Sequence, residues 1–335
     1  MSSITSTRVS VEDEVATVAT KAPRPAARTL QPRLTTTVPR EYVHRAAVSE
    51  VLLTGWEAAA ELAGPDLPDV FAVSAQWPRS HSFFTPSGGY QDPMLLIESV
   101  RQIGSLLAHA EFGVPFGHQF LMWDMSFSTA PELLVAGAAP TEVELRTVCR
   151  DIVRRGRVLG GMRYDVTVLR DGQALATAGA AFSCTSPAVH RRLRAGRPTT
   201  TDRVAPPPID PAAVGHADDR HVLLAEPAPG VDNRWELRVD TAHPTFFDHP
   251  VDHIPGMVLL EAARQAALVS TGLPDALLLG LKSNFARYAE FDAPCWIEPY
   301  PEIRSTDDGV LVRVRGTQHA ETVFTADLVL KPSGR

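Results

Sequence analysis

Groups that could carry out acid–base and acyl chemistry gather around one expected helix start. An apolar run opens after the turn signal Pro255-Gly256 and carries three polar residues at spacings of three and four, Glu261, Arg264 and Gln265. Such spacings place them on one side of a helix. Two histidines, His249 and His253, precede the turn. The first amides of a helix are free and its start is positive, so the amides of Gly256 and Met257 suit a developing oxyanion.

The same pattern occurs twice in the chain. Glu98, Arg101 and Gln102 repeat the second set at a constant offset, because 261 − 98, 264 − 101 and 265 − 102 all equal 163. The aromatic pairs keep this offset, Phe83-Phe84 answering to Phe246-Phe247. A later echo, Phe127 with Glu132 against Phe285 with Glu290, has an offset of 158. Self-similarity of this length predicts two copies of one helix-plus-strands unit.

The composition limits the class of protein. A chain of 335 residues is long enough for two domains, and its 44% hydrophobic and 21% charged residues are typical of a soluble globular protein. A net charge of −7 disfavours a nucleic-acid binder. Three cysteines without paired spacing favour a reduced, intracellular setting. We find no secretion signal and no apolar run long enough for a membrane span, so we expect a cytoplasmic protein.

The element pattern predicts four segments. We expect a disordered N-terminal arm at 1–36, a first unit at 37–185, a linker rich in Pro, Arg and Thr at 186–218, and a second unit at 219–335. Each unit has one long helix, at 93–112 and 256–270. The first unit has strands at 42–43 and 46–54, a short helix at 55–63, and strands at 70–76, 119–126, 141–153, 158–170 and 173–184. Strands of the second unit are expected at 220–226, 234–241, 277–285, 294–303, 309–316 and 321–331.

The fold class that these elements predict is α+β. The second helix is apolar around most of its circumference, so its sheet should wrap it. One long helix cradled by an antiparallel sheet is the hotdog fold, and two units make a tandem (double) hotdog. The run from Pro255 to Gln265, P-G-M-V-L-L-E-A-A-R-Q, resembles the helix-opening motif of the 3-hydroxyacyl-carrier-protein dehydratases of that fold.

A fuller resemblance is to the A-factor biosynthesis (AfsA-like) family. Members carry two such units, with D-H-P-V-D-H-x-P-G-M-V-L-L-E-A-A-R-Q in the second and an E-x-x-R-Q helix in the first. Both motifs are present here, and three more stretches look similar, V-P-R-E-Y-V-H-R-A at 38–46, V-L-L-T-G-W at 51–56 and H-S-F-F at 81–84. The resemblance covers roughly residues 38–331.

The resemblance implies an acyltransferase of γ-butyrolactone signal biosynthesis. Such an enzyme moves a β-ketoacyl group from acyl carrier protein to the hydroxyl of dihydroxyacetone phosphate, and the ester cyclises to a butenolide. We accordingly expect these two partners, no cofactor, no nucleic acid and no membrane. Two units in one chain can pair with each other, so the chain is expected to be a monomer or a homodimer. Two alternatives stay open, a hotdog 3-hydroxyacyl-thioester dehydratase or thioesterase, and a non-catalytic acyl- or lactone-binding protein.

The two helix glutamates are the expected catalytic carboxylates. A surface ion pair with the arginine at i+3 would contribute well under ~1 kcal/mol and would be structural only. The apolar surroundings argue against that interpretation, because burying charges is costly. Burial is also expected to raise the carboxylate pKa, as a general base requires. Glu261 should then serve the acceptor hydroxyl, and Glu98 should act in a second site or help shape one shared site.

The remaining candidates have binding or orienting roles. Arg101 and Arg264 either neutralise the glutamates or bind the acceptor phosphate, for which the guanidinium fork is suited. Gln102 and Gln265 can hydrogen-bond the glutamates or hold the sheet. Phe84 and Phe247 belong to the core or line an acyl tunnel.

The histidines place the main site at the second helix. His249 stands where the dehydratases have a histidine that acts on the substrate, and His253 is expected to contact substrate. Their spacing matches no zinc motif, so no metal is expected. The first copy has Asp92-Pro93 in place of Pro255-Gly256, and Pro93 has no amide hydrogen to donate.

Two groups of arginines are candidates for a weaker role. Those between Arg146 and Arg163 alternate with apolar residues, which is typical of a solvated strand face, although a basic patch would also suit an acidic carrier protein. The arginines of the linker, Arg191, Arg192, Arg194 and Arg197, are most simply solubilising.

Overall fold

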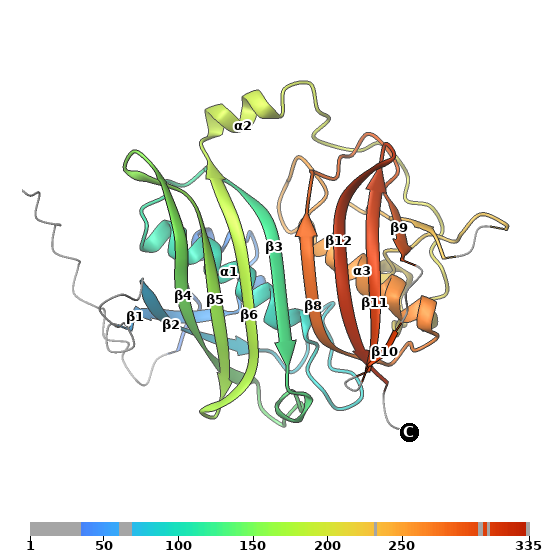
Figure 1. Ribbon diagram of the computed structural model, residues 1–335, viewed down its shortest axis with the longest axis horizontal. Coiled ribbons are helices and arrows are strands. Elements are labelled where there is room, and N and C mark those ends of the chain that lie inside the picture. Colours follow the sequence, from blue (N-terminus) through green and yellow to red (C-terminus); the bar gives the residue numbers. More distant parts are fainter. Residues whose placement is uncertain (1–34, 60–68, 231–232, 301–303, 307–308, 333–335) are drawn as a thin grey trace, which may run out of the picture.

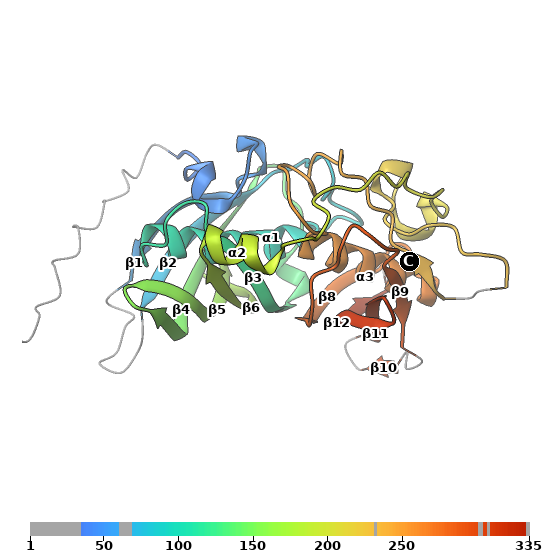
Figure 2. The same ribbon diagram turned by 90° about the horizontal axis from the view of Figure 1, so that it is seen from above.

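The computed structural model describes residues 35–59, 69–230, 233–300, 304–306 and 309–332. The expected arm at 1–36 lies almost wholly outside these residues, as do parts of the expected helix at 55–63 and strand at 294–303. The described residues form one continuous antiparallel sheet, and the two long helices pack on the same face of it (Figures 1 and 2).

The first unit contributes six strands and one helix. The strand order is β1-β2-β4-β5-β6-β3. The strands are β1 (Leu53–Ala58), β2 (Val70–Trp77), β3 (Gln119–Thr129), β4 (Thr141–Arg155), β5 (Val158–Arg170) and β6 (Gln173–Thr185). The helix α1 (Met94–Ala110) crosses them. Every residue of α1 is buried except Arg101 and Ala110, so the sheet encloses the helix as its sequence predicts.

The second unit repeats the plan and extends the sheet. The order continues β8-β12-β11-β9-β7, and β10 pairs with β11. Its strands are β7 (Trp235–Glu236), β8 (Leu277–Phe285), β9 (Trp296–Pro299), β10 (Arg304–Thr306), β11 (Gly309–Gln318) and β12 (Glu321–Lys331), and its helix is α3 (Gly256–Thr271). Two helices wrapped by antiparallel strands in one chain are a tandem hotdog, which confirms the expected fold class.

The units meet where β3 pairs with β8. In this antiparallel ladder Met125 lies opposite Ser283, and the Ser283 hydroxyl donates to the Met125 carbonyl at 2.9 Å. Their separation, 283 − 125 = 158, equals the offset of the strand repeat. The pair therefore lies on the pseudo-two-fold axis that relates the units. The helices α1 and α3 consequently face each other across the junction, and each helix start lies near the middle of the other helix.

The repeat shifts by one residue in the loops before the helices. The His81 Nδ1 atom accepts from the amides of Phe83 and Phe84, and the His243 Nδ1 atom accepts from those of Thr245 and Phe246. The loops thus correspond at 243 − 81 = 162, whereas the helices correspond at 163. The ungapped match expected from the sequence therefore does not extend through the loop.

Several expected strands proved wrong. Residues 42–43 and 48–50 lie in the 3-10 helices η1 (Arg40–Val43) and η2 (Val48–Glu50), and the described part of the expected helix at 55–63 belongs mostly to β1. The strand expected at 220–226 begins as the 3-10 turn η6 (Asp219–His221), because the Asp218 carboxylate accepts from the Arg220 amide. The strand expected at 234–241 is reduced to the two residues of β7.

The linker contains a helix that the sequence analysis missed. Helix α2 (Pro187–Leu193) begins after Ser186, whose side chain accepts from the Val189 amide. Serine at the N-cap and proline at the first position are the usual local signals of a helix start. Figure 1 shows α2 beyond the end of β6, at the sheet edge where β3 begins and β8 ends.

Candidate active site

A cavity of about 240 Å³ lies between the two units. Residues of both units line it, which favours the shared site among the arrangements that the sequence allowed. Four of the expected site residues are in its lining, Arg101, His249, His253 and Gly256. Seven are not, namely Glu98, Glu261, Arg264, Gln102, Gln265, Phe84 and Phe247. Most of the remaining wall is apolar, with Phe120, Met122, Met125, Phe182, Leu259 and Leu260 among its members.

The start of α3 opens onto this cavity. Gly256 and Met257 line it, and no side chain caps this helix start. The amides of Val258 and Leu259 both bond to the Pro255 carbonyl, so the first two amides, those of Gly256 and Met257, have no acceptor within the helix. A Cβ atom at position 256 would lie 3.3 Å from the Phe285 ring, which makes glycine the residue that keeps this approach open. The geometry suits an oxyanion.

The start of α1 is closed in the corresponding place. Asp92 is buried, and its Oδ1 atom accepts from the Met94 amide at 2.9 Å. The same carboxylate accepts from Nη1 of Arg264 at 3.0 and 2.9 Å. Since Asp92 corresponds to Pro255, one carboxylate occupies the helix start that is free in the second unit. The two halves are therefore not equivalent.

Glu98 is the counter-ion of two arginines. Its carboxylate accepts from Arg101 Nε and Nη2 at 2.8 and 2.7 Å, and lies 2.6 Å from Arg45 Nη2. Burial alone would raise its pKa, but Arg101 and Arg45 outweigh burial and lower the pKa to about 2. The expectation that enclosure raises the pKa is therefore wrong for this group. Glu98 is ionised at neutral pH and both its oxygens are engaged.

Among the described residues, Glu261 is paired with a single arginine, Arg264, which it shares with the carboxylate of Asp92. Arg264 Nη2 donates to the Glu261 Oε1 atom at 3.0 Å, and Nη1 of the same arginine binds Asp92. Burial would again raise the pKa of Glu261, but Arg264 and His216 lower it overall. The side chain is fully buried and does not reach the cavity. The structure thus places Glu261 and Arg264 inside the protein but away from the open site.

The ion-pair clusters on the two helices differ in composition. In the first unit two guanidinium groups share one carboxylate, and no second carboxylate lies within 4.0 Å of either among the described residues. In the second unit one guanidinium serves two carboxylates, those of Asp92 and Glu261. The Asp248 carboxylate also acts on Arg45 and Arg101 from beyond this distance, so the first cluster is close to neutral, whereas the second has an excess of negative charge that would repel an anion. The asymmetry makes Arg101 a better candidate than Arg264 for binding an anion.

The glutamines support the fold in the same way in both units. Gln102 accepts from the Leu52 amide and donates to the Glu50 carbonyl and to Glu98. Gln265 accepts from the Leu223 amide and donates to the His221 carbonyl and to Glu261. Each glutamine thereby ties its helix to the segment that crosses above it. These contacts agree with a structural role for both glutamines, and neither side chain lines the cavity.

Three histidines line the cavity, and each has a different partner. His253 Nδ1 lies 2.8 Å from Asp252 Oδ1, whereas His249 Nδ1 lies 3.4 Å from Asp248 Oδ2. His44 Nε2 lies 2.7 Å from His109 Nε2.

His44 and His109 form a neutral chain of defined tautomers. The carbonyl of Val114 can only accept, so His109 donates to it from Nδ1 at 2.7 Å. His109 Nε2 then accepts, and His44 Nε2 donates. Burial and the positive charge of Arg101 lower the pKa of His44 to about 3. His44 also has a φ of 53°, a strained value that persists where surrounding structure enforces it.

Sequence reasoning missed His44 and Arg45. Both line the cavity, and Arg45 Nη1 donates across the junction to the Thr245 carbonyl at 3.0 Å. Both lie in the stretch 38–46 that resembles the A-factor biosynthesis family, and this resemblance was the sequence feature that could have indicated them. The aromatic pairs differ from the expectation. Phe246, and not Phe247, lines the cavity, and Phe84 packs against Phe246 from inside the core.

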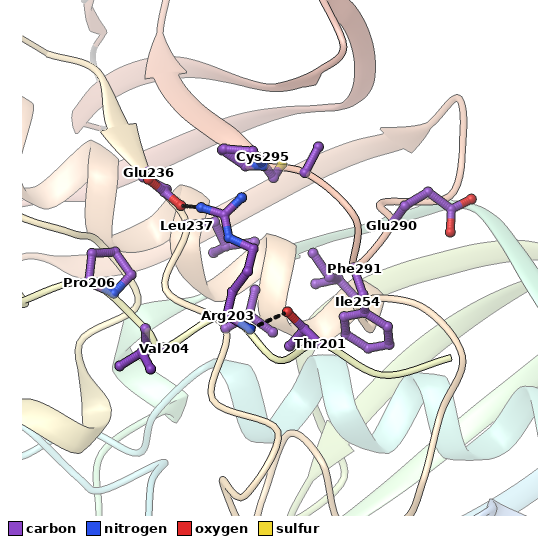
Figure 3. Close-up of a pocket in the computed structure, with 14 residues that line it drawn as sticks. Thr201, Arg203, Val204, Pro206, Glu236, Leu237, Ile254, Glu290, Phe291 and Cys295 are labelled. Atoms are coloured by element: carbon purple, nitrogen blue, oxygen red, sulfur yellow. Dashed lines mark hydrogen bonds and ion pairs between the residues drawn. The ribbon is translucent and has the colours of Figure 1, made fainter. Parts of the chain in front are cut away.

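Two other hollows lie away from the start of α3. One of about 30 Å³ lies under the linker, where Arg203 binds Glu236 (Figure 3), and it has room for little more than a single water molecule. The other is an open groove on strands β3–β6, β8, β11 and β12, lined by Arg146, Arg150 and Arg163. Among the described residues no group of three or more His, Cys, Asp or Glu side chains could hold a metal ion, and no helix is long and apolar enough to cross a membrane.

A continuous sheet with two enclosed helices and a cavity between them defines a tandem hotdog protein. The chain belongs to the A-factor biosynthesis hotdog domain family, which it matches over residues 26–186 and 198–332. The putative oleoyl thioesterase from Lactobacillus plantarum is a solved structure of similar extent, 12% identical, with a TM-score of 0.48 over 81% of this chain and 99% of that one.

Curated relatives share one name. The chain is 52% identical to a 2-oxo-3-(phosphooxy)propyl 3-oxoalkanoate synthase of Streptomyces virginiae, over 87% of this chain and 97% of the relative. It is 38% identical to the synthases of that name from Streptomyces griseus and Streptomyces coelicolor, over 86% and 87% of this chain and 93% and 90% of theirs.

Proposed function

We propose that this chain is an acyltransferase that moves a β-ketoacyl group from acyl carrier protein to the hydroxyl of dihydroxyacetone phosphate. The family and the shared name of the curated relatives support this reaction. One observation carries it: a single cavity joins Arg101 of the first unit, whose Nη1 atom has no acceptor among the described residues, to the free amides of the second. One substrate here is an anion and the other develops an oxyanion, so the reaction needs both features in one place.

The phosphate is placed beside Arg101. Nε and Nη2 of Arg101 are used by Glu98 and by the Val43 carbonyl. Nη1 has no acceptor among the described residues, so it is left to bind a ligand. Arg45 contributes positive charge, although Glu98 and the Thr245 carbonyl occupy its nitrogens.

The acyl thioester is placed at α3. Its carbonyl oxygen would receive the amides of Gly256 and Met257, and its chain would lie along the apolar wall. A carbonyl held there is polarised as negative charge develops on its oxygen. The phosphorylated acceptor, bound at the opposite wall, would then present its hydroxyl to the carbonyl carbon.

Neither helix glutamate is placed to take the hydroxyl proton. Glu261 does not reach the cavity, and Glu98 is neutralised by two arginines with a pKa of about 2. We therefore assign Glu98 to the positioning of Arg101. Among the groups that line the cavity, the histidines are the natural bases for this proton.

The test supplies a β-ketoacyl carrier protein and dihydroxyacetone phosphate to the pure protein and detects the phosphorylated ester by mass spectrometry. Arg101→Met should raise the KM for the acceptor roughly ten- to hundredfold, because a charge-assisted hydrogen bond is lost. Arg146→Met, on an exposed strand, is the matched control. Turnover of a thioester without acceptor would support a dehydratase or thioesterase instead, and tight binding without turnover would support a binding protein.

A further inference from the structure

We infer that His253, held by Asp252, takes the proton of the acceptor hydroxyl. This assignment rests on the proposed function and names its proton carrier. His253 Nδ1 donates to Asp252 Oδ1 at 2.8 Å, because an ionised carboxylate can only accept. The neutral ring therefore has its lone pair on Nε2. His253 lines the cavity that also contains the α3 amides.

Asp252 is fixed from the other side by the linker helix. Its Oδ2 atom lies 2.7 Å from His190 Nε2 and 3.2 Å from Arg194 Nε. His253, His190 and Arg194 together lower the pKa of Asp252, so this carboxylate stays ionised. It can then orient the imidazole and stabilise its protonated form.

Arg194 is itself held rigidly. It makes two hydrogen bonds to Glu290, at 2.6 and 2.7 Å, and its guanidinium lies 4.5 Å from the centre of the Tyr288 ring. Tyr288 in turn packs edge-on against His253 at 4.7 Å and lines the cavity. The groups facing His253 are thus Asp252 from its own loop, Tyr288 from the segment after β8, and Arg194 from the linker through Asp252. Arg194 and Asp252 are positioning residues.

The proton balance of the transfer is complete with this group. As the acceptor oxygen bonds to the thioester carbon, its proton passes to His253 Nε2. The carbon–sulfur bond then breaks, and the imidazolium returns the proton to the leaving thiolate. The products are the phosphorylated ester and the free carrier-protein thiol. No oxidant, metal or further reactant is required.

The other cavity histidines are less suited to this task. The nearest carboxylate to His249 is 3.4 Å away, and it already accepts from the amides of Ala46 and Ala47 at 2.6 and 2.9 Å. His44 donates from Nε2 to His109 and lies beside Arg101, whose charge opposes protonation. Only His253 combines a close carboxylate with a place in the lining.

The experiment compares His253→Asn with His249→Asn under saturating substrates. His253→Asn should lower kcat by about 10²- to 10⁴-fold with little change in acceptor KM. Asp252→Asn should lower kcat with little change in acceptor KM, since the imidazole loses the carboxylate that orients it. A parental kcat in His253→Asn, or the larger kcat loss in His249→Asn, would overturn the assignment. Absence of product from the parent protein would instead refute the proposed function.

A second inference concerns the outer face of α2. His190 and Arg194 face inward to Asp252, whereas Arg191 and Arg192 are exposed and have no ion pair among the described residues. Exposed apolar side chains lie with them, Val189 at 45% and Leu193 at 63% exposure. This face is therefore basic and partly apolar.

The two ends of α2 contact segments that lead to opposite walls of the cavity. At its start, a Cβ atom on Gly117 would lie 3.7 Å from Pro187, and Gly117 lies two residues before β3, whose first residues line the cavity. At its end, Arg194 lies on Tyr288, which lines the cavity from the second unit. A partner seated on α2 would stand at the cavity rim.

We propose that α2 docks the acyl carrier protein that delivers the thioester. Arg191 and Arg192 complement an acidic protein surface, and the apolar side chains would be covered on contact. The arginines that line the groove on the sheet fit this role less well, because each is paired with a carboxylate: Arg146 with Glu144, Arg150 with Asp165 and Arg163 with Asp124. They also line the groove on the sheet and not the cavity.

The experiment uses the double variant Arg191→Glu/Arg192→Glu and two acyl donors. With β-ketoacyl carrier protein its KM should rise at least about tenfold, since like charges now meet. With the small N-acetylcysteamine thioester its kinetics should match the parent. Arg146→Glu/Arg150→Glu is the control and should keep the parental KM for carrier protein. An unchanged KM in the α2 variant, or the same rise with the small thioester, would reject the docking surface.

Discussion

Arg264 of α3 binds Asp92 at the start of α1 across the junction of the two units, with hydrogen bonds of 3.0 and 2.9 Å. The equivalent positions with the units exchanged are Arg101 of α1 and Pro255 at the start of α3, because 264 − 101 and 255 − 92 both equal 163. Proline offers no carboxylate, so the second pairing leaves a free guanidinium nitrogen and open amides. The duplicated scaffold has one closed site and one open site.

Arg264→Met should destabilise the fold more than Arg101→Met. Arg264 is the arginine that neutralises both Asp92 and Glu261, and leaving buried carboxylates unpaired costs about 3–5 kcal/mol. Glu98 keeps Arg45 when Arg101 is removed. Urea unfolding of the two variants measures the difference. Equal losses would contradict the charge asymmetry between the two clusters.

Glu98→Gln should raise the KM for the phosphorylated acceptor more than it lowers kcat. The carboxylate positions Arg101 and carries no proton in the reaction, since its pKa is about 2. Steady-state kinetics separate the roles, because loss of a general base would lower kcat by about 10²- to 10⁴-fold at constant KM.

Glu98 should also contribute to acid unfolding. Its folded pKa lies below the ordinary value of 4.5, so its contribution is complete above that value and is lost as the pH falls toward 2. The Glu98→Gln variant should show a shallower fall in unfolding free energy over this window. An equally steep fall in the variant would show that the pKa of Glu98 does not differ between the folded and unfolded protein.

Buried neutral histidines should add a second acid-sensitive window at higher pH. The pKa of His44 is lowered from 6.5 to about 3, and that of His243 to about 4, in both cases chiefly by burial. Below pH 6.5 the unfolded chain takes up protons that the folded protein does not, so stability falls as the pH decreases from 6.5 toward these values. His44→Asn should weaken this dependence in denaturant titrations at several pH values. A parental slope would mean that His44 is protonated in the fold.

Ser105→Leu should shift the enzyme toward shorter acyl chains. Ser105 lies on α1, is 5% exposed and lines the cavity among apolar groups. A larger side chain there takes space from the end of a long substrate and leaves a short one unaffected. Competition between short and long β-ketoacyl thioesters measures the preference. An unchanged ratio would place the acyl chain elsewhere in the cavity.

Much of the fold was determined by local signals in the sequence. The apolar helices and the alternating strands at 158–170, 277–285 and 321–331 were predicted to the residue or nearly so, because periodicity reflects which face is buried. The segments before β1 and before β7 were misread. There hydrophobic residues pack against the helices from short turns, and a short apolar run cannot distinguish such a turn from a strand.

The sequence alone also determined that two E-x-x-R-Q helices exist and that the helix start at Gly256 is suited to an oxyanion. It could not determine which arginine faces the open site, since the two motifs are identical. The tertiary structure decided this by packing the middle of each helix against the start of the other helix. Asp92 neutralises Arg264, whereas Pro255 leaves Arg101 available. The electrostatic role of each copy is therefore set by its neighbour in space and not by its own motif.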